Sequence, residues 1–198
     1  GHNTAVGADS QLNATTGEQN TSLGSLSMGI GVTTGDANVA IGASAGKRIT
    51  SAAQNVFIGN SAGANITTAA GTVAIGYDAL TTEDDHGTTT AVGYQSLTLQ
   101  NAGASSFNTA LGYQSGLALT TGVKNVVTGS GAGAAITTGS YNTAIGYQAL
   151  GSEDAHGRNV AIGYAALNQQ NAGADGYNVA IGMESGLAIN TGIQNTLI

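Results

Sequence analysis

Asn38-Val39-Ala40-Ile41-Gly42 is one copy of a pentapeptide that returns along the whole chain. The copies begin at Asn3, Asn20, Asn38, Asn55, Thr72, Thr89, Asn108, Asn125, Asn142, Asn159, Asn178 and Asn195. Successive copies lie 17 residues apart, except for one interval of 18 and two of 19. A fixed period of this length is typical of proteins built from stacked repeats. A second period of 70 residues lies above it, because Gln100-Asn101-Ala102-Gly103-Ala104 recurs as Gln170-Asn171-Ala172-Gly173-Ala174.

The pentapeptide alternates in the manner of a short β-strand. Position two is Val or Thr in all twelve copies, and position four is apolar in eleven. Side chains two apart point to one face of a strand, so position three, which is Ala in eight copies, lies on the other face. We expect this small-residue face to be tightly packed and to bury against partner chains.

Positions one and five have their own structural requirements. Gly at position five predicts a bend with positive φ or a close approach of two backbones. Asn at position one favours a left-handed turn conformation and a ladder of stacked side-chain amides. The predicted ladder residues are Asn38, Asn55, Asn108, Asn125, Asn142, Asn159 and Asn178, with Gly42, Gly59, Gly76, Gly93, Gly112, Gly146, Gly163 and Gly182.

After this Gly the repeats continue in two ways. Some have a second Gly followed three residues later by Ile or Leu, as in Gly46 and Ile49, whereas others place Leu at once, as in Ala79-Leu80. Either pattern supplies a second apolar side chain to close the coil, and a polar cluster such as Thr-Thr-Gly then turns the chain back. These features predict an all-β parallel β-solenoid of about 12 coils of 17–19 residues.

We expect residues 1–198 to form a single β-solenoid domain of roughly 55 Å, at roughly 4.8 Å per coil. The chain opens and stops within a repeat, which indicates a fragment of a longer repetitive fibre. Each coil offers only three or four sizeable apolar groups. At roughly 1.5–3 kcal/mol per buried side chain against roughly 1–2 kcal/mol per ordered residue, one chain is marginal. We therefore predict a homotrimer.

Composition excludes several function classes. The net charge is −7, and the 4 basic residues are scattered, so neither nucleic acid nor anionic lipid is an expected partner. No apolar run is long enough to cross a membrane, and the lack of Cys excludes disulfides and thiolate metal sites. We expect no cofactor.

The repeats Asn38-Val39-Ala40-Ile41-Gly42 and Asn178-Val179-Ala180-Ile181-Gly182 resemble the head repeats of trimeric autotransporter adhesins. Asn142 to Leu150 is also similar to repeats of phage tail fibres and other surface fibres. The resemblance covers the whole chain and implies a left-handed parallel β-roll trimer. It further implies an extracellular location, on a virion fibre or a bacterial surface, and adhesion to a host-cell receptor or glycan.

Two kinds of loop are candidate receptor-binding sites. The acidic loops combine carboxylates with a His, which favours either a cation or receptor site or, as we prefer, a solvated turn without a metal. The longer loops carry the two extra residues of the 19-residue coils, and insertions in solenoids often map to a binding face. The candidates are Glu83, Asp84, Asp85, His86, Glu153, Asp154 and His156 in the acidic loops, and Gln100, Asn101, Phe107, Gln170, Asn171 and Tyr177 in the longer ones.

Three other features of the sequence each allow a functional and a purely structural interpretation. Tyr77, Tyr94, Tyr113, Tyr147 and Tyr164 follow the position-five Gly and predict a vertical stripe, used either for sugar stacking or, as we favour, for packing between protomers. Thr pairs such as Thr67-Thr68 resemble an ice-binding array, but Asp84-Asp85 interrupts it. A fibre-borne glycan depolymerase would need catalytic residues outside the repeat, and we expect none. The sequence therefore predicts a structural or adhesive fibre segment rather than an enzyme.

Overall fold

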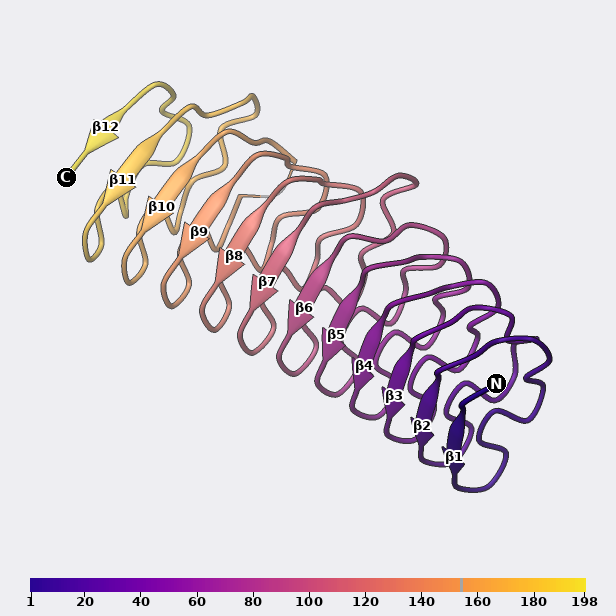
Figure 1. Ribbon diagram of the computed structural model, residues 1–198. Coiled ribbons are helices and arrows are strands. Elements are labelled where there is room, and N and C mark those ends of the chain that lie inside the picture. Colours follow the sequence, from indigo (N-terminus) through magenta and orange to yellow (C-terminus); the bar gives the residue numbers. More distant parts are fainter. Residues whose placement is uncertain (154) are drawn as a thin grey trace.

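In a computed structural model that describes residues 1–153 and 155–198, the chain forms a parallel β-solenoid (Figure 1). Each coil contributes one strand, and the strands pair in sequence order to form one twelve-stranded sheet. The strands are β1 (Thr4–Val6), β2 (Thr21–Leu23), β3 (Val39–Ile41), β4 (Val56–Ile58), β5 (Val73–Ile75), β6 (Thr90–Val92), β7 (Thr109–Leu111), β8 (Val126–Thr128), β9 (Thr143–Ile145), β10 (Val160–Ile162), β11 (Val179–Ile181) and β12 (Thr196–Leu197). The described residues form no helix, and so none that could span a membrane.

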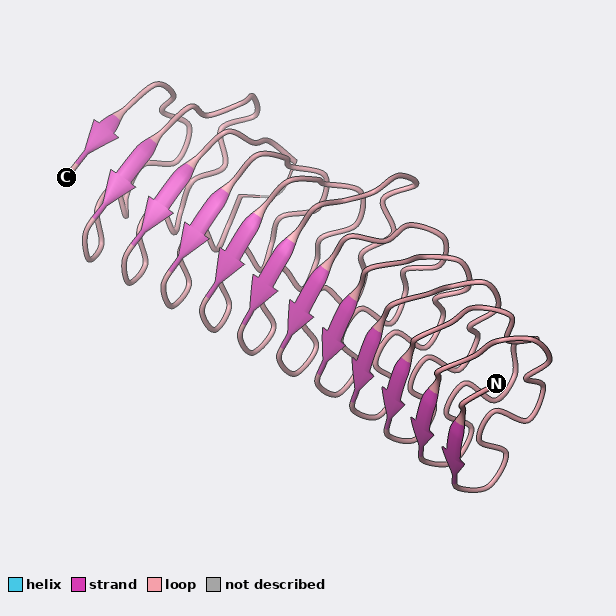
Figure 2. Cartoon of the chain, viewed as in Figure 1, coloured by secondary structure: helices cyan, strands magenta, loops and turns pink. Residues whose placement is uncertain are grey.

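Every strand stacks in register on its equivalent one coil away. Val39 pairs with Val56 and Ile41 with Ile58, and the 19-residue interval leaves Thr90 paired with Thr109 in the same way. The extra residues of a longer coil are therefore absorbed outside the strand. Figure 2 shows the strands in a single row, with turns and loops forming the rest of each coil. Twelve strands at about 4.8 Å spacing give a rod of about 53 Å.

The small-residue face of the strands is the interior of the coil. Ala40, Ala74 and Ala144 at position three are fully buried, whereas positions two and four are exposed or half-buried. The expectation that the small face packs against partner chains is therefore wrong. The second half of each coil folds back over this face, where Ala is the commonest side chain and Phe57 and Val127 are also fully buried. The β-branched and aliphatic face points outward instead.

The two coil types fill the same interior volume in different ways. Counting from the first residue of the pentapeptide, position nine is either Gly or Leu in the third to eleventh coils, whereas the first two coils carry Gln11 and Met28 there. In the Gly coils the apolar side chain comes from position twelve, as at Ile49, and in the Leu coils from position nine itself, as at Leu80. A Cβ on Gly46 would lie 2.8 Å from Cδ1 of Ile49. The predicted apolar closure is confirmed in the third to eleventh coils, and the two forms exclude one another sterically.

Gly at position five meets both of its predicted requirements. Gly59 has φ +131°, and a Cβ there would lie 2.5 Å from the carbonyl oxygen of Gly76 in the next coil. The Asn ladder also forms, since Asn38 Oδ1 accepts hydrogen bonds from the backbone N–H and the side chain of Asn55. The left-handed conformation, however, belongs to the residue before each Asn from Asn20 onward, as at Gln54 with φ +60°. The Asn itself begins the extended segment that becomes the strand.

Candidate functional site

The acidic loop of the fifth coil begins inside the solenoid. Glu83 occupies position twelve, where the Gly coils carry Ile or Leu, and its side chain is fully buried. Leu80 at position nine already fills the apolar interior, so position twelve is free to be polar. The interpretation of the loop as a solvated turn is therefore wrong for Glu83 alone, because Asp84, Asp85 and His86 reach the surface.

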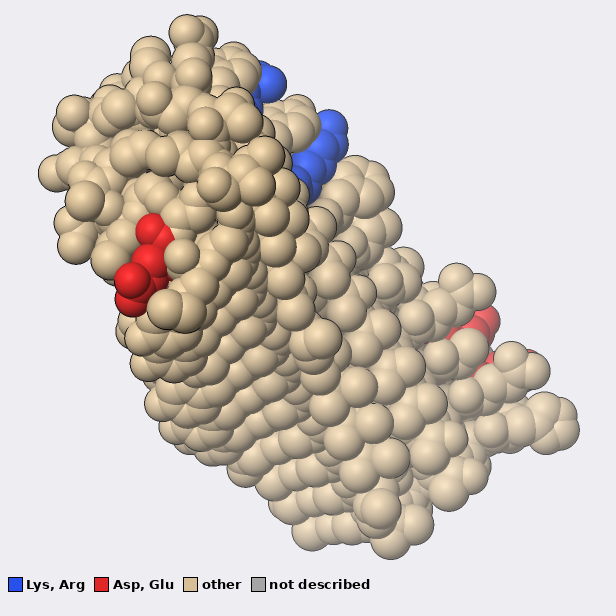
Figure 3. All heavy atoms as spheres, turned by 90° about the vertical axis from the view of Figure 1, so that its left-hand side faces the viewer, with Lys and Arg blue, Asp and Glu red and all other residues tan. Residues whose placement is uncertain are grey.

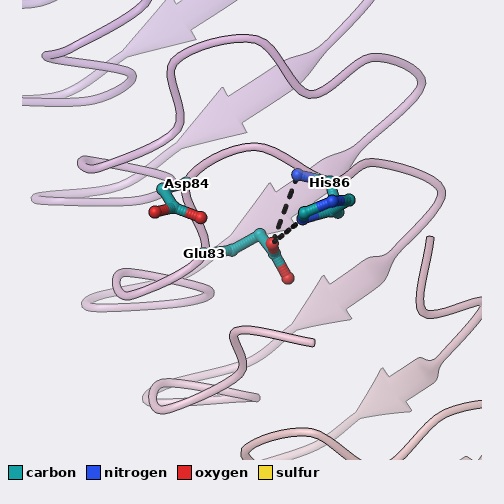
Figure 4. Close-up of side chains that lie close together, drawn as sticks. All are labelled: Glu83, Asp84 and His86. Carbon is teal, nitrogen blue, oxygen red and sulfur yellow. Dashed lines mark hydrogen bonds and ion pairs between the residues drawn. The ribbon is translucent and has the colours of Figure 1, made fainter. Parts of the chain in front are cut away.

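Glu83 faces His86 within a tight turn (Figure 4). Its Oε1 accepts a hydrogen bond of 3.4 Å from the backbone N–H of His86 and lies 4.0 Å from the ring Nδ1. Neither Glu83 Oε2 nor His86 Nδ1 has a hydrogen-bond partner, and both atoms are buried. One ligand atom from each of Glu83, Asp84 and His86 lies within 4.8 Å of the others. The loop thus gathers two carboxylates and an imidazole at the edge of the interior.

Burial dominates the acid–base behaviour of Glu83. It raises the pKa of this carboxyl to about 7, and the neighbouring Asp84 carboxylate acts in the same direction. The backbone amides of His86, Ala102 and Asp84 act in the opposite direction without cancelling the effect of burial. The carboxyl group consequently holds its proton to a higher pH than an exposed glutamate does.

The same arrangement returns 70 residues later. Glu153 is fully buried, its Oε1 accepts a hydrogen bond of 3.3 Å from the backbone N–H of His156, and the ring Nδ1 lies 3.6 Å away. The predicted site residue Asp154 lies outside the described residues. Glu83 and Glu153 are four coils apart, which corresponds to about 19 Å along the rod.

The longer loops divide into buried and displayed residues. Gln100 and Gln170 occupy position twelve and are fully buried, so these two predicted binding residues do not face solvent. Gln100 Oε1 accepts a hydrogen bond of 2.6 Å from Asn108, and its Nε2 donates one of 3.0 Å to the carbonyl oxygen of Thr120. Of the predicted binding residues in these loops, Asn101, Phe107, Asn171 and Tyr177 lie at the surface.

The Tyr stripe forms as predicted, with its rings stacked on one another. The ring centroids of Tyr77 and Tyr94 are 5.2 Å apart, those of Tyr94 and Tyr113 5.3 Å, and those of Tyr147 and Tyr164 5.5 Å. Since the interplanar angles are 9–13°, each ring face turned toward the next Tyr is covered. The stripe therefore presents mainly ring edges and hydroxyl groups, which leaves little flat surface for a sugar ring.

A second column of stacked side chains, beside the Tyr stripe, was not predicted from the sequence. The residues directly before the position-one Asn in five successive coils form a cation–aromatic column, consisting of Phe107, Lys124, Tyr141, Arg158 and Tyr177. Lys124 Nζ lies 5.2 Å from the centroid of Tyr141, and the Arg158 guanidinium lies 5.0 Å from Tyr141 and 5.5 Å from Tyr177. All five side chains are exposed. The signal was visible, since each of these residues follows the last at a whole repeat.

One acidic group borders this column. Asp175 accepts a hydrogen bond of 2.8 Å from Arg158 Nε and another of 3.0 Å from the backbone N–H of Gly157. These two donors hold the pKa of Asp175 below its usual value. The pair is about half-exposed, so its contribution to folding stability is small. Its effect is to fix the direction of the Arg158 side chain.

The Thr columns are engaged in contacts between coils. Thr67 Oγ1 donates to the carbonyl oxygen of Asp84 at 3.1 Å and lies 2.8 Å from Asp85 Oδ1. Thr120 Oγ1 donates to the carbonyl oxygen of Thr137. Asp84 continues the Thr column in the next coil, so the array is interrupted as the sequence indicated.

Comparison of the chain with family models, with curated proteins and with solved structures found no match.

Proposed function

We propose that this chain is a segment of an extracellular fibre, on a phage virion or a bacterial surface, whose role is mechanical. The chain forms a rigid rod and displays a host-binding surface along its length. The observation that carries the proposal is the outward apolar face of the twelve-stranded sheet. Among its side chains, Val6, Leu23, Ile58, Leu111, Val126, Ile145 and Ile181 are 36–55% exposed.

An apolar strip of this kind, interrupted at Thr128, indicates an interaction surface. Single exposed apolar residues are normal on soluble proteins, but contiguous strips mark places where another surface docks. The side of the solenoid seen in Figure 3 carries few charged groups, and these lie near its edges. A second copy is the natural partner, because identical coils at identical spacing match along the entire length of the rod.

We propose that the assembly is a homotrimer of left-handed β-rolls. The number three and the handedness come from the resemblance to adhesin head repeats. The outward apolar face supports the association itself, since burying this face against sister chains removes it from water. The Tyr stripe follows the strand by two residues and extends the same surface.

Sedimentation equilibrium tests this assembly. The double variant Ile58→Lys, Ile145→Lys places two charges on the outward face and is expected to convert a trimer to monomers. The control Thr68→Lys, Thr138→Lys places the same charges at exposed turn positions and is expected to remain trimeric. A wild-type chain that stays monomeric at high micromolar concentration would overturn the proposal.

We further propose that the displayed surface recognises an acidic glycan through the cation–aromatic column. Lys124 and Arg158 supply half of the 4 basic side chains of a chain with net charge −7. Tyr141 and Tyr177 place hydroxyl groups beside them. Along one line parallel to the rod, charge and hydrogen-bond donors therefore alternate from coil to coil, at about 4.8 Å.

Binding to immobilised polygalacturonate, with neutral dextran as reference, tests this surface. Lys124→Gln, Arg158→Gln is expected to lower the affinity about tenfold or more, and added salt to weaken binding to the wild type. The matched control Lys47→Gln, Arg48→Gln makes the same change in net charge outside the column. Equal losses in both variants would mean that net charge, rather than the column, attracts the polymer.

The alternatives give different results. An ice-binding solenoid would inhibit ice recrystallisation at micromolar concentration, and a depolymerase would shorten a surface polysaccharide on incubation. An adhesive fibre segment is expected to do neither while retaining cell or glycan binding.

A further inference from the structure

The acidic loops show a polar side chain where the fold elsewhere places an apolar one. Ile49, Ile66, Leu119 and Ile136 fill position twelve of the Gly coils, and all are fully buried. Glu83 at the same position brings a carboxyl group into the interior. A buried polar atom without a partner costs about 1–3 kcal/mol, and more when it is charged. Such a residue calls for a ligand or a partner that offsets this cost.

The neighbouring coil shows how a polar side chain at this position is otherwise satisfied. Gln100 lies one coil after Glu83, is equally buried, and has a hydrogen bond at each end of its amide. Glu83 is less well satisfied, because its Oε2 has no hydrogen-bond partner and its Oε1 accepts a long bond of 3.4 Å from the His86 amide, although the backbone amides of Ala102 and Asp84 also lie near the carboxyl group. The nearby imidazole Nδ1 of His86 is also buried and without a partner.

We infer that each acidic loop binds a divalent transition-metal ion, with Glu83, Asp84 and His86 as the ligands of the first site. The unpartnered and fully buried Glu83 carboxylate is the inner ligand. His86 and Asp84 are half-buried, and they complete the site from the solvent side, through which the ion enters. Glu153 and His156 supply the equivalent ligands of the second loop.

The donor set selects the class of ion. One imidazole nitrogen and two carboxylates suit Zn²⁺, Co²⁺ or Mn²⁺, whereas Mg²⁺ and Ca²⁺ prefer oxygen ligands alone. For ligand bonds of about 2.1 Å, tetrahedral donors stand about 3.4 Å apart. The donors of the loop lie within 4.8 Å of one another, so rotation of short side chains closes the difference. Water fills the remaining positions on the exposed side.

The bound metal would stabilise the turn and would take no part in a reaction. It joins the interior residue Glu83 to the surface residues Asp84 and His86, and so ties the turn of the coil to the core. Because the loop recurs after four coils, two ions would brace the rod at about 19 Å intervals. A ligand that binds only the folded chain raises its stability in proportion to the logarithm of its concentration.

Titration of the chelator-treated chain with Zn²⁺ alone and Co²⁺ alone tests the inference. We expect two ions per chain by calorimetry, and for Co²⁺ a visible absorption band from nitrogen and oxygen ligation. Glu83→Gln, Glu153→Gln should abolish both signals, and Glu83→Gln alone should leave one ion per chain. These variants are expected to fold, since Gln already occupies the same position at residues 100 and 170.

The control His2→Gln removes a histidine outside the loops and should still bind two ions, whereas His86→Gln, His156→Gln should bind none. Zn²⁺ should raise the melting temperature of the wild type and leave that of Glu83→Gln, Glu153→Gln unchanged. An unchanged stoichiometry in the glutamate variants, fewer than one ion per wild-type chain, or binding of Ca²⁺ and Mg²⁺ in preference to Zn²⁺ and Co²⁺ would each overturn the inference.

Discussion

Asn38 Oδ1 accepts two hydrogen bonds from Asn55 one coil further along, from its backbone N–H at 3.2 Å and from its Nδ2 at 3.0 Å. Asn55 repeats the motif by accepting from the backbone N–H of Thr72 at 2.8 Å. Its Nδ2 also donates to the carbonyl oxygen of Ala69 at 2.9 Å. The Asn55 side chain therefore satisfies two buried backbone groups of the next coil, the N–H of Thr72 and the carbonyl oxygen of Ala69. Removal of one Asn leaves several of these groups without partners.

Replacement of Asn55 by Ala is expected to lower the free energy of unfolding by about 2–4 kcal/mol, because two or more buried polar groups lose their partners. Urea denaturation followed by circular dichroism measures the change. The control Asn60→Ala alters an exposed side chain five residues away, whose oxygen accepts only from Ser61. Its effect should stay within about 0.5 kcal/mol. Equal effects of the two variants would contradict a structural role for the ladder.

A methyl group added at a position-five Gly should destabilise the fold more than a methyl group added at a loop Gly. Gly59→Ala adds a Cβ 2.5 Å from the carbonyl oxygen of Gly76, in a backbone conformation with φ +131° that other residues rarely adopt. We expect a loss of about 3–5 kcal/mol, or failure to fold. Gly103→Ala is the matched change, since its Cβ has nothing within 4 Å and its φ is +65°. Its cost should be about 1–2 kcal/mol. Thermal melting of both variants makes the comparison.

If Leu at position nine and Ile at position twelve fill the same interior volume, substitutions should convert one coil type into the other. Leu80→Gly empties the interior and should cost about 2–5 kcal/mol. Glu83→Ile adds an apolar side chain beside the Leu that is already there. The double variant reproduces the pattern of Gly46 and Ile49, and it should be more stable than the sum of the single effects by about 1–3 kcal/mol. A double-mutant cycle in urea measures this coupling, and additivity within about 0.5 kcal/mol would refute the shared volume.

The metal-free chain should lose stability as pH rises toward neutrality. Burial raises the pKa of Glu83 from 4.5 to about 7, so the folded state holds its proton more tightly than the unfolded state does. The stability that this group contributes is complete below about pH 4.5 and is lost as pH rises through about 7, on the order of 1–3 kcal/mol. Urea midpoints in chelator at pH 5, 6, 7 and 8 measure the effect.

The variant Glu83→Gln cannot titrate at this position and provides the control for that series. It should show a smaller loss of stability between pH 5 and pH 8 than the wild type. The double variant Glu83→Gln, Glu153→Gln removes the second buried carboxyl group as well and tests whether it adds to the dependence. A profile that is identical in wild type and double variant would show that neither carboxyl is responsible.

Much of the fold could be predicted from the sequence, because in a solenoid residues that are one repeat apart in the sequence are in contact in the structure. Each residue of a coil lies against its equivalent one repeat away, as Val39 lies against Val56, so the 17-residue period states the sheet register directly. The position-five Gly and the stacked Asn side chains followed from the same logic. The Tyr stripe was predictable for the same reason, since Tyr77, Tyr94 and Tyr113 recur at whole repeats.

The candidate site was less predictable than the fold. The acidic and longer loops were located, but Glu83 and Gln100 were expected at the surface because polar residues in turns usually face water. Their burial follows from Leu80 and Leu97, which fill the interior from position nine and leave position twelve to a polar side chain. The column of Lys124, Tyr141 and Arg158 was missed because its members differ in type, although they share one position in the repeat.

By itself the sequence determined the number of coils, their register, the short strands and the two patterns of coil closure, since all of these depend on the period and on local backbone preference. Only the tertiary structure decided which face of the strand is inside. Alternation distinguishes Ala40 from Val39 and Ile41 but does not say which of the two faces the coil closes over. Closure of the coil placed Ala40 inside, turned Ile58 and Ile145 toward the surroundings, and drew Glu83 into the core.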